Sequence, residues 1–173
     1  MKLQIHNISR VVIAGLLRPG LLVKAAFLNV LVGSFLVFVT YSVMIANTGD
    51  ATGLQEFILF LLWFTPANLY LLYNFIDLRM YACSTYVELT NNGLVVSSKT
   101  IKQNFSSTIS FENLSGVTVA QSFTNKVFGI AAIVVNSESG EGFSPWGFKY
   151  DEAEKFSQKV LEKHRVLFRQ VRK

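Results

Sequence analysis

The stretch that decides the fold of the C-terminal half reads YVELTNNGLVVSSKTIKQNF and covers residues 86–105. Two β-prone runs, YVELT and LVVSS, flank the tripeptide Asn91-Asn92-Gly93. Asn and Gly readily adopt the positive φ angles that tight hairpin turns need, so this stretch predicts a β-hairpin that turns at these three residues.

Short β-prone runs continue from this hairpin toward the C-terminus. They are TIKQNF, STISF, VTVAQS, AAIVVNS and GFSPWGF, and turn-forming clusters such as ENLSG and SESGEG separate them. Together with the hairpin they make about seven strands, a spacing that is typical of a small antiparallel sandwich or a partly open barrel.

The last segment changes to a helical pattern. Apolar residues recur at helical spacing from Ala153 to Val171, and acids precede bases along the segment, as the helix dipole favours. We expect Asp151 to cap this helix, with Glu154 completing a capping box. Because a single amphipathic helix must bury its apolar stripe, we expect it to cover the open end of the small β structure.

Upstream of the hairpin the chain is much more apolar. The whole sequence is 51% hydrophobic, with a mean hydropathy of +0.38, and two runs without any charge lie at residues 25–46 and 57–76. At ~1.5 Å per residue, each run is long enough to cross a hydrocarbon core of ~30 Å. Both runs therefore predict transmembrane helices rather than buried core helices, and Pro66 within the second is tolerated in such helices.

The charges around these runs predict an orientation. The segment before the first run contains four bases and no acid, whereas residues 47–56 contain Asp50 and Glu56 and no base. By the positive-inside rule, the N-terminus and everything after Asp77 are expected on the cytoplasmic side. The bases are Lys2, Arg10, Arg18 and Lys24.

The N-terminal segment, residues 1–20, allows two interpretations. Ile5, Ile8, Val12 and Leu16 follow roughly helical spacing, which predicts an amphipathic helix at the membrane surface that ends near Pro19. The alternative is a simple extension of the first transmembrane helix.

The order of strands and one terminal helix resembles the bacterial membrane-anchored pleckstrin-homology-like (PH-like) domain family. The resemblance rests on VELTNNGLVVSS, on ISFENLSGVTVAQS and on FTNKVFGIAAIVVNS, in which Gly129 precedes a strand. It implies an α+β membrane protein of the bacterial inner membrane, with a two-helix transmembrane hairpin followed by a PH-like antiparallel sandwich or barrel capped by a C-terminal helix. The expected segments are 1–20 (interfacial), 21–46 and 57–76 (transmembrane), 47–56 (outer loop), 77–85 (linker) and 86–173 (PH-like domain).

Residues suited to catalysis are few. His6 and His164 lie far apart in the sequence, Cys83 has no neighbouring His, and neither a glycine-rich phosphate loop nor metal-ligand spacing is present. We therefore expect no catalytic residue, no cofactor and no metal site. Nucleic acid is not an expected partner, because aromatic residues are not interleaved with the basic cluster. The single Cys fits a reducing compartment.

An apolar stretch near residue 129 is the first candidate for binding. FTNKVFGIAAIVV is unusually apolar for a loop and strand of a small β domain. Such a surface favours a partner subunit, so we expect a homo-oligomer or an assembly with other membrane-protein subunits. The candidate association residues are Phe123, Val127, Phe128 and Ile130.

Basic and intramembrane polar residues are the other candidates. Five bases near the C-terminus could attract anionic lipid, although a solvated helix end would show the same pattern. Lys99, Lys102 and Lys126 are too scattered to predict a headgroup pocket. Polar residues within the apolar runs predict hydrogen bonds across the hairpin or to another subunit. The two sets are Lys163, Arg165, Arg169, Arg172 and Lys173, and Asn29, Thr65, Asn68 and Asn74.

The sequence thus predicts a membrane-anchored protein without enzymatic activity that works by protein association or scaffolding at the inner leaflet. The alternative function is a module that senses lipid headgroups or the state of the membrane.

Overall fold

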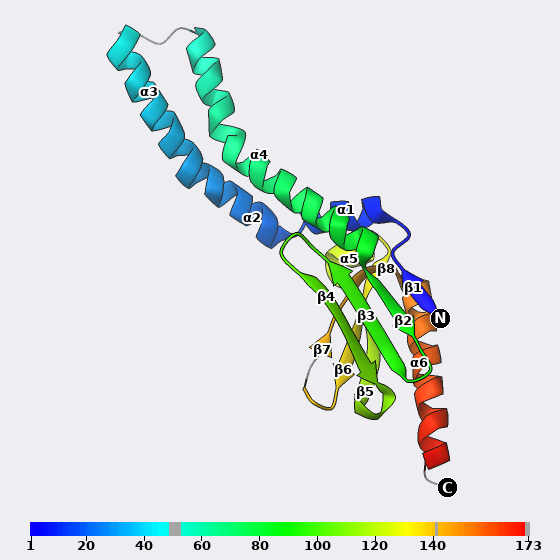
Figure 1. Ribbon diagram of the computed structural model, residues 1–173. Helices are drawn as coiled ribbons and strands as arrows, with labels where there is room; N and C mark the ends of the chain where they lie inside the picture. Colours follow the sequence, from blue (N-terminus) through cyan, green and yellow to red (C-terminus); the bar gives the residue numbers. More distant parts are fainter. Residues whose placement is uncertain (49–52, 141, 172–173) are drawn as a thin grey trace. The chain divides into compact units, whose positions relative to one another are not determined.

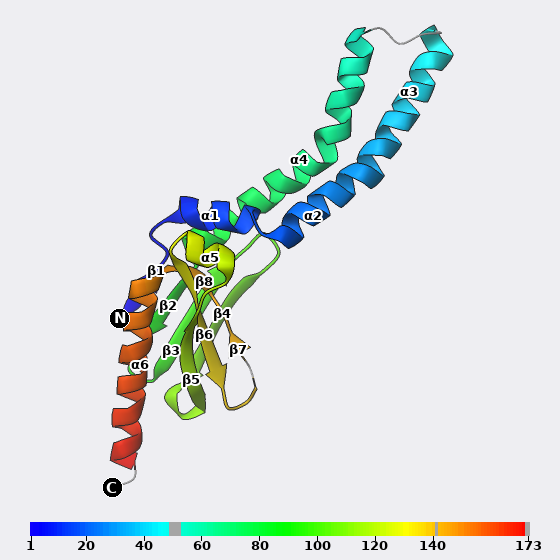
Figure 2. The same cartoon turned by 180° about the vertical axis from the view of Figure 1, so that it is seen from behind.

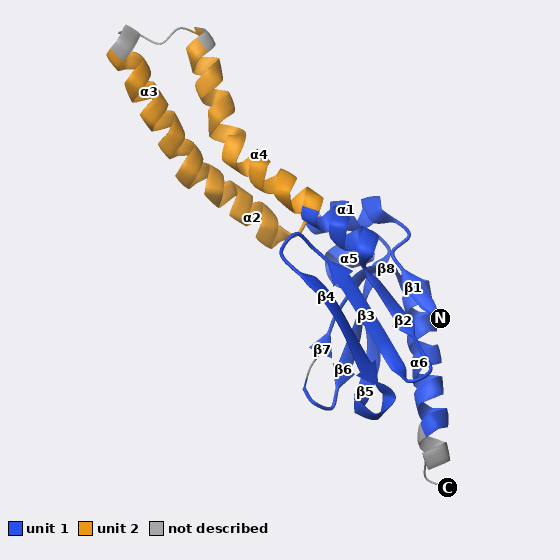
Figure 3. Ribbon diagram, in the orientation of Figure 1, with its two compact units in different colours: residues 1–15, 77–173 blue, residues 16–76 orange. Residues whose placement is uncertain are grey.

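A computed structural model describes residues 1–48, 53–140 and 142–171 of the chain. The chain forms two compact units (Figure 3). One, the β unit, comprises Met1–Gly15 and Asp77–Lys173, and the other, the apolar hairpin, comprises Leu16–Ile76. The chain therefore leaves the β unit after Gly15 and returns to it at Asp77.

The first sheet of the β unit contains four antiparallel strands in the order β1-β2-β3-β4. Leu3 of β1 lies opposite Val87 of β2, which lies opposite Val96 of β3, and all three side chains are buried. Alternate residues of each strand thus face the core, as the strand period of two requires. The strands are β1 (Lys2–Gln4), β2 (Tyr86–Leu89), β3 (Gly93–Lys99) and β4 (Asn104–Ser110).

A 3-10 turn, η2 (Phe111–Asn113), leads into the second antiparallel sheet. Its strand β6 pairs with β5 on one side and with both β7 and β8 on the other. A short helix, α5, connects β5 to β6 (Figure 1). The elements are β5 (Leu114–Ala120), α5 (Phe123–Val127), β6 (Ile130–Ser137), β7 (Gly142–Phe143) and β8 (Trp146–Lys149).

The C-terminal helix α6 (Tyr150–Val171) covers the β structure as predicted. It packs against β5, β6, β8 and β1, and Ala153, Phe156 and Val160 are fully buried. The buried Ser157 hydroxyl donates a hydrogen bond of 3.1 Å to the Val117 carbonyl. Asp151 does not cap this helix as expected. Helix α6 begins one residue earlier, at Tyr150, so Asp151 lies inside its first turn.

The N-terminal segment contains an amphipathic helix that ends before Pro19, as one interpretation predicted, and it also contributes a strand that the sequence did not predict. Residues 2–4 form β1 of the first sheet, and Leu3, Ile5 and Val11 are buried in the same core as the strands. Helix α1 (Ile8–Leu16) follows, with the Asn7 side chain accepting a hydrogen bond from the Arg10 amide at 3.1 Å. A three-residue strand is too short to give a periodic signal, and its partner is more than 80 residues away, which is why pattern analysis missed it.

The expected linker, residues 77–85, is also part of the β unit. Helix α4 (Gly53–Ser84) continues through it, and the Ser84 hydroxyl accepts a hydrogen bond of 2.8 Å from the Lys99 amide. Thr85 is buried and its hydroxyl donates to the Tyr81 carbonyl. The domain boundary expected at residue 86 is therefore replaced by a unit built from both ends of the chain.

The sequence-based assignment of strands and turns needs three corrections. Residues 100–103 form a turn, so TIKQNF and STISF contribute to the single strand β4. Pro145, which lacks an amide hydrogen, separates β7 from β8 within GFSPWGF. Among the described residues, the only positive φ angles occur at glycines 129, 140 and 147, so the turn at 91–93 does not use the positive φ expected there.

The apolar hairpin contains α2 (Pro19–Leu28), the π-helical turn η1 (Asn29–Gly33), α3 (Ser34–Thr48) and the first part of α4. Pro19–Ala46 and Gln55–Ser84 are long and apolar enough to cross a membrane, with mean hydropathies of 2.2 and 1.4 in their most apolar windows. Those windows are only 17% and 6% buried, unlike the core helices of soluble proteins. Residues 49–52 of the expected outer loop lie outside the described residues.

Candidate functional site

The end of the β unit from which the chain enters the apolar hairpin combines several functional features; we call it the exit end. A Cβ atom added at Gly15 would lie 2.7 Å from the Leu78 side chain, so the outgoing and incoming segments are in contact. The Asp77 carboxylate accepts a hydrogen bond of 2.7 Å from the Ile101 amide, which places the β3–β4 turn here as well. Figures 1 and 2 show α5 beside α1 in both views.

Exposed apolar side chains gather at the exit end. Phe123 and Val127 of α5 are 84% and 67% exposed, and Ile13 of α1 and Ile101 of the β3–β4 turn are also exposed. Helix α5 is held in place by its N-cap Ser122, whose hydroxyl accepts from the Asn125 amide. Exposed large apolar residues in a cluster, rather than singly, indicate a surface that contacts another molecule or a membrane.

Exposed basic side chains lie among these apolar residues. The acid at the point where the chain returns is Asp77, and its carboxylate already accepts a hydrogen bond from the Ile101 amide. The exit end therefore carries a positive charge that suits an anionic partner. The basic residues are Arg10, Arg79, Lys99, Lys102 and Lys126.

A polar cavity of about 500 Å³ opens at the same end. It lies between the start of α1, the residues before β6 and the start of α6. The His6 Nε2 and the Glu152 carboxylate are 4.0 Å apart at its rim. At Gly147 the φ angle is +101°, and an added Cβ would lie 2.9 Å from Val11, so only glycine lets β8 approach α1 this closely. The cavity is lined by His6, Asn7, Arg10, Gly129, Ile130, Gly147, Lys149 and Glu152.

A second cavity, of about 300 Å³, forms an aromatic groove between β4 and the β7–β8 segment. The Phe105 and Phe143 rings lie 5.0 Å apart, and Tyr81 stacks on Trp146 at 5.5 Å. The Tyr81 hydroxyl accepts a hydrogen bond of 2.8 Å from the Trp146 amide and holds the stacked pair in place. The groove can take up an apolar side chain of a partner.

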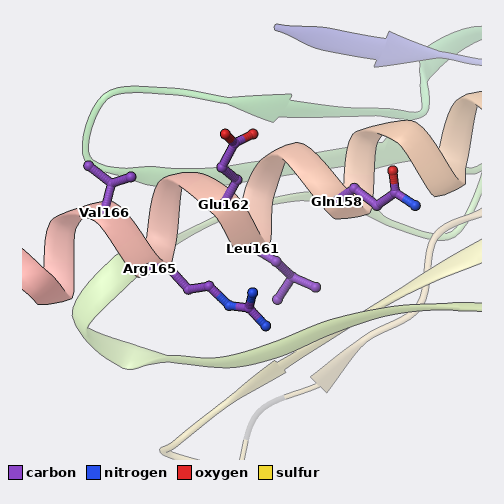
Figure 4. Close-up of a pocket in the computed structure, with 5 residues that line it drawn as sticks. All are labelled: Gln158, Leu161, Glu162, Arg165 and Val166. Carbon is purple, nitrogen blue, oxygen red and sulfur yellow. The ribbon is translucent and has the colours of Figure 1, made fainter.

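A third cavity, of about 500 Å³, lies along α6. Its described lining comes from this helix alone. In Figure 4, Glu162 and Val166 lie on one side of the helix, whereas Leu161 and Arg165 point to the other. These side chains do not converge on one point, so we assign no binding role to this cavity.

Only two of the four residues predicted to form an association surface are exposed. Phe123 and Val127 are exposed, but Ile130 is 2% exposed and Phe128 packs against the core. Ile130 begins β6, and the alternation of this strand points its side chain inward. An apolar run by itself does not reveal which residues a sheet buries, so the sequence assigned Ile130 to the surface wrongly.

The predicted basic cluster lies in a different place from the exit end. Figures 1 and 2 show the C-terminal part of α6 at the opposite end of the β unit from α1 and α5. Lys163 donates hydrogen bonds to the Thr90 carbonyl at 2.7 Å and to the Asn91 side chain, so it joins α6 to the β2–β3 turn. Lys163 is therefore held by the β unit, and the attraction of the other bases to anionic lipid stays a prediction. The side chain of Arg169 and the residues Arg172 and Lys173 lie outside the described residues.

The polar residues of the apolar hairpin mostly bond within their own helix. Thr65 and Asn74 donate to the carbonyls of Leu61 and Tyr70, four residues earlier. Asn68 is exposed, and the structure gives its side chain no hydrogen bond among the described residues. These three therefore do not make the expected bonds across the hairpin.

Different residues join the two helices of the hairpin. The Trp63 indole donates to the Ser34 hydroxyl at 3.3 Å, and an added Cβ at Gly33 would lie 2.4 Å from the Trp63 carbonyl oxygen. Gly33 thus permits the close crossing, as small residues do in membrane helices. Asn29, at the start of the π-helical turn, is 7% exposed, and its side-chain oxygen has no hydrogen-bond partner among the described residues.

Residues suited to catalysis do not come together. His6 lies at the exit end, whereas His164 contacts the Phe111 ring at 6.4 Å, and Cys83 is exposed on the last turn of α4. Within the described part of the chain, no group of three or more His, Cys, Asp or Glu side chains is placed to hold a metal ion. The absence of a catalytic function remains a prediction.

Comparison with known proteins identifies the family. The family model described as the bacterial PH domain matches residues 27–164, which run from the first apolar helix into α6. No curated protein and no solved structure matches the chain. The match covers well over half of the sequence, and its second part coincides with two antiparallel sheets closed by a C-terminal helix. The chain therefore belongs to the bacterial PH domain family.

Proposed function

We propose that this chain is a membrane-anchored, non-enzymatic binding module that takes up an extended segment of a partner protein at the edge of its β unit. The apolar hairpin would cross the bacterial inner membrane twice and leave the β unit, with both termini, in the cytoplasm. The low burial of both apolar helices and the excess of bases before the first one support this arrangement. The proposal includes no cofactor, metal ion or nucleic acid.

The observation that carries the proposal is the open edge of β4. Within the described residues this strand pairs with β3 alone. Hydrogen bonds from the Thr100 amide to the Gln103 carbonyl and from the Phe111 amide to the Asn92 carbonyl mark the two ends of the ladder. Because bonded and non-bonded pairs alternate in an antiparallel ladder, the backbone groups of Ser106 and Thr108 point outward.

The composition of β4 leaves this edge unprotected. The strand reads NFSSTIS over seven residues, with no charge and no proline. Natural proteins usually protect an exposed edge with lysine, proline or a bulge, because a free edge pairs with other chains. An added strand would gain main-chain hydrogen bonds here, and the adjacent aromatic groove would select one of its side chains. The aromatic groove would then provide specificity, whereas the groove and the main-chain hydrogen bonds would together provide affinity.

A proline substitution tests the edge directly. Ser106→Pro removes an outward amide without breaking a bond to β3, so the β unit should stay folded. A photo-crosslinking residue placed at Thr108 of the full-length protein in native membranes should react with a discrete protein. We expect Ser106→Pro to reduce this product about tenfold, since one lost hydrogen bond costs ~1 kcal/mol and the ring adds a steric clash. Ser106→Ala, which keeps the backbone amide, should leave the amount of crosslinked product unchanged.

Two further measurements complete the test. A crosslinker at the exposed Lys155 of α6 should give no such product, and equal products from both positions would contradict the proposal. The mass of the product distinguishes a second copy of this chain from another membrane protein. Light scattering of the purified protein, after subtraction of the detergent, tests the expected homo-oligomer independently.

A further inference from the structure

We infer that the partner at the β4 edge is a different membrane protein, and that the segment it adds lies on the cytoplasmic side, just before one of its transmembrane helices. This inference deepens the proposed function and rests on its membrane anchoring and on strand addition at β4. The direction of β4, the position of the exit end and the uncharged lining of the aromatic groove support it.

Strand β4 begins at the exit end and runs away from it. Just before the strand, the Asp77 carboxylate accepts a hydrogen bond from the Ile101 amide, and Asp77 is the first residue after the apolar hairpin. Just after the strand, the Phe111 amide donates to the Asn92 carbonyl in the β2–β3 turn. Lys163 of α6 also contacts this turn, at the end of the β unit opposite α1 and α5 in Figures 1 and 2. The first residues of β4 therefore lie nearer to a membrane that contains the hairpin.

An added strand that pairs antiparallel with β4 runs toward the exit end. Every strand pair of the described β unit is antiparallel, and this pairing is slightly more stable per residue than parallel pairing. The C-terminal end of the added segment then points to the membrane. A partner chain that continues in this direction enters the membrane from the cytoplasmic side as a transmembrane helix.

A second copy of this chain cannot supply the strand from its own β4. Each β4 begins at its own exit end, so antiparallel pairing of two β4 strands would place the two exit ends at opposite ends of the joined sheet. The two apolar hairpins could not then lie in one membrane. Parallel pairing about a two-fold axis would bring the same backbone groups to the same height, whereas a parallel ladder needs them one residue out of step. The expected homo-oligomer would therefore form through another surface.

The short length of the edge favours a partner held in the same membrane. With seven residues, β4 offers few main-chain hydrogen bonds, and each contributes little net free energy. Anchoring of both chains in one membrane raises their effective concentration, so that even a weak contact is populated. A segment next to a transmembrane helix has this advantage, whereas a segment of a soluble protein lacks it.

The aromatic groove determines which residue of the added segment is selected. Phe105 lies on the core-facing side of β4, and its ring lies 5.0 Å from that of Phe143. In an antiparallel pair the residue opposite Phe105 points to the same side and so enters the groove. Among the described residues the lining carries no charged side chain, and the groove has a volume of about 300 Å³. We expect one large apolar or aromatic side chain of the partner at this position.

Charges beyond the two ends of β4 agree with this direction. Lys102 lies two residues before the strand and Glu112 two residues after it, and both are exposed. An antiparallel segment has its first residues near Glu112 and its last residues near Lys102. A segment that begins with a base and ends with an acid is therefore complementary to the edge, whereas the reverse order places like charges together.

Crosslinks from two positions on the edge determine the direction of the added segment. Photo-crosslinking residues at Asn104 and at Thr108 of the full-length protein in native membranes should react with the same partner, and mass spectrometry of the digested products locates the linked residues. We expect the residue linked from Asn104 to follow the residue linked from Thr108 by about four positions, because the chains are antiparallel. Both should precede a transmembrane helix of the partner on its cytoplasmic side. The reverse order, a soluble partner or a second copy linked through its own β4 would overturn the inference.

Substitutions in the groove test the selection of one side chain. Phe143→Ser should reduce the product from Thr108 about tenfold, the effect of removing one central aromatic contact. Phe143→Leu, which keeps an apolar lining, should retain most of the product. Phe123→Ser, which changes an exposed phenylalanine of α5 outside the groove, should leave the amount unchanged. Equal products from Phe143→Ser and the unchanged protein would contradict the role of the groove, and thermal unfolding of each variant controls for loss of the fold.

Failure of this inference can be distinguished from failure of the proposed function. Absence of a product at Thr108, or a product that Ser106→Pro does not reduce, would contradict strand addition and this inference with it. A product that Ser106→Pro reduces, but that links a soluble protein or shows the reverse order, would overturn this inference alone.

Discussion

Tyr81 shows how a single side chain joins the last turns of α4 to the second sheet. Its hydroxyl accepts from the Trp146 amide at 2.8 Å and donates to the Trp146 carbonyl at 3.2 Å. Tyr81→Phe keeps the stacked ring but removes the partner of two partly buried backbone groups. We expect the free energy of unfolding of the β unit to fall by about 1–3 kcal/mol. Tryptophan fluorescence during chemical unfolding measures this loss.

The control for this variant is Tyr150→Phe, which removes a hydroxyl from an exposed tyrosine at the start of α6. Its stability should match that of the unchanged protein. Equal stability of Tyr81→Phe and the unchanged protein would mean that water replaces the tyrosine hydroxyl at no cost.

Gly93 is required for a reason that the turn motif did not reveal. The β2–β3 turn is closed by Thr90, whose hydroxyl accepts from the Gly93 amide and donates to the Gly93 carbonyl. Glycine is needed because β4 lies so close: an added Cβ would lie 2.0 Å from the Ile109 carbonyl oxygen. A backbone atom cannot move aside as a flexible side chain can, so Gly93→Ala must displace one of the two strands.

We expect Gly93→Ala to destabilise the β unit by about 2 kcal/mol or more, the range of overpacking in a filled interior. Gly116→Ala in β5 is the matched control, since nothing lies within 4 Å of the added Cβ and its φ is not positive. That variant should be neutral or slightly stabilising, because alanine restricts the unfolded chain. Similar melting temperatures for both variants would contradict this account.

Among the elements, α6 was the easiest to predict and β1 the hardest. Helix α6 has a 22-residue amphipathic pattern, so its length and its buried stripe were visible in the sequence. Strand β1 has three residues and depends on pairing with β2. Its stabilisation comes from Leu3 in the shared core, a contact that no local pattern encodes.

The role of α6 as a cover gives a prediction for the element. Val160 is fully buried against the β structure, so Val160→Asp would place an unpaired carboxylate in that interface. We expect a loss of several kcal/mol, enough to unfold the β unit or to release α6. Glu162→Ala on the exposed side should be nearly neutral. Limited proteolysis together with thermal melting distinguishes release of the helix from global unfolding.

For the whole molecule, the charge distribution predicts which side of the membrane each part occupies. In a Cys83→Ser background, a cysteine at Thr52 should react with a membrane-impermeant maleimide added outside intact spheroplasts. A cysteine at Ser139, in the β6–β7 turn, should react only after lysis. Labelling of Ser139 from outside, or no labelling of Thr52 from either side of the membrane, would contradict the two-span arrangement.

The sequence by itself determined which parts of the chain form long apolar helices and which form most of the strands. Uncharged runs of 20 residues or more indicate lipid-soluble helices, and alternation interrupted by turn residues indicates strands, because both patterns are local consequences of backbone geometry. The family resemblance was likewise visible, since its motifs, although spread along residues 87–137, are hydrophobic stretches that can be read directly from the sequence.

Only the tertiary structure decided which distant residues meet. The return of the N-terminus as β1, the burial of Ile130 and the pairing of Lys163 with the β2–β3 turn all depend on contacts between residues far apart in the chain. The polar cavity has the same origin, since Arg10 and Lys149 are brought together by α1 packing against β8. Local patterns specify which elements form. Burial and long-range pairing specify which side chains share a site, and both are properties of the folded chain.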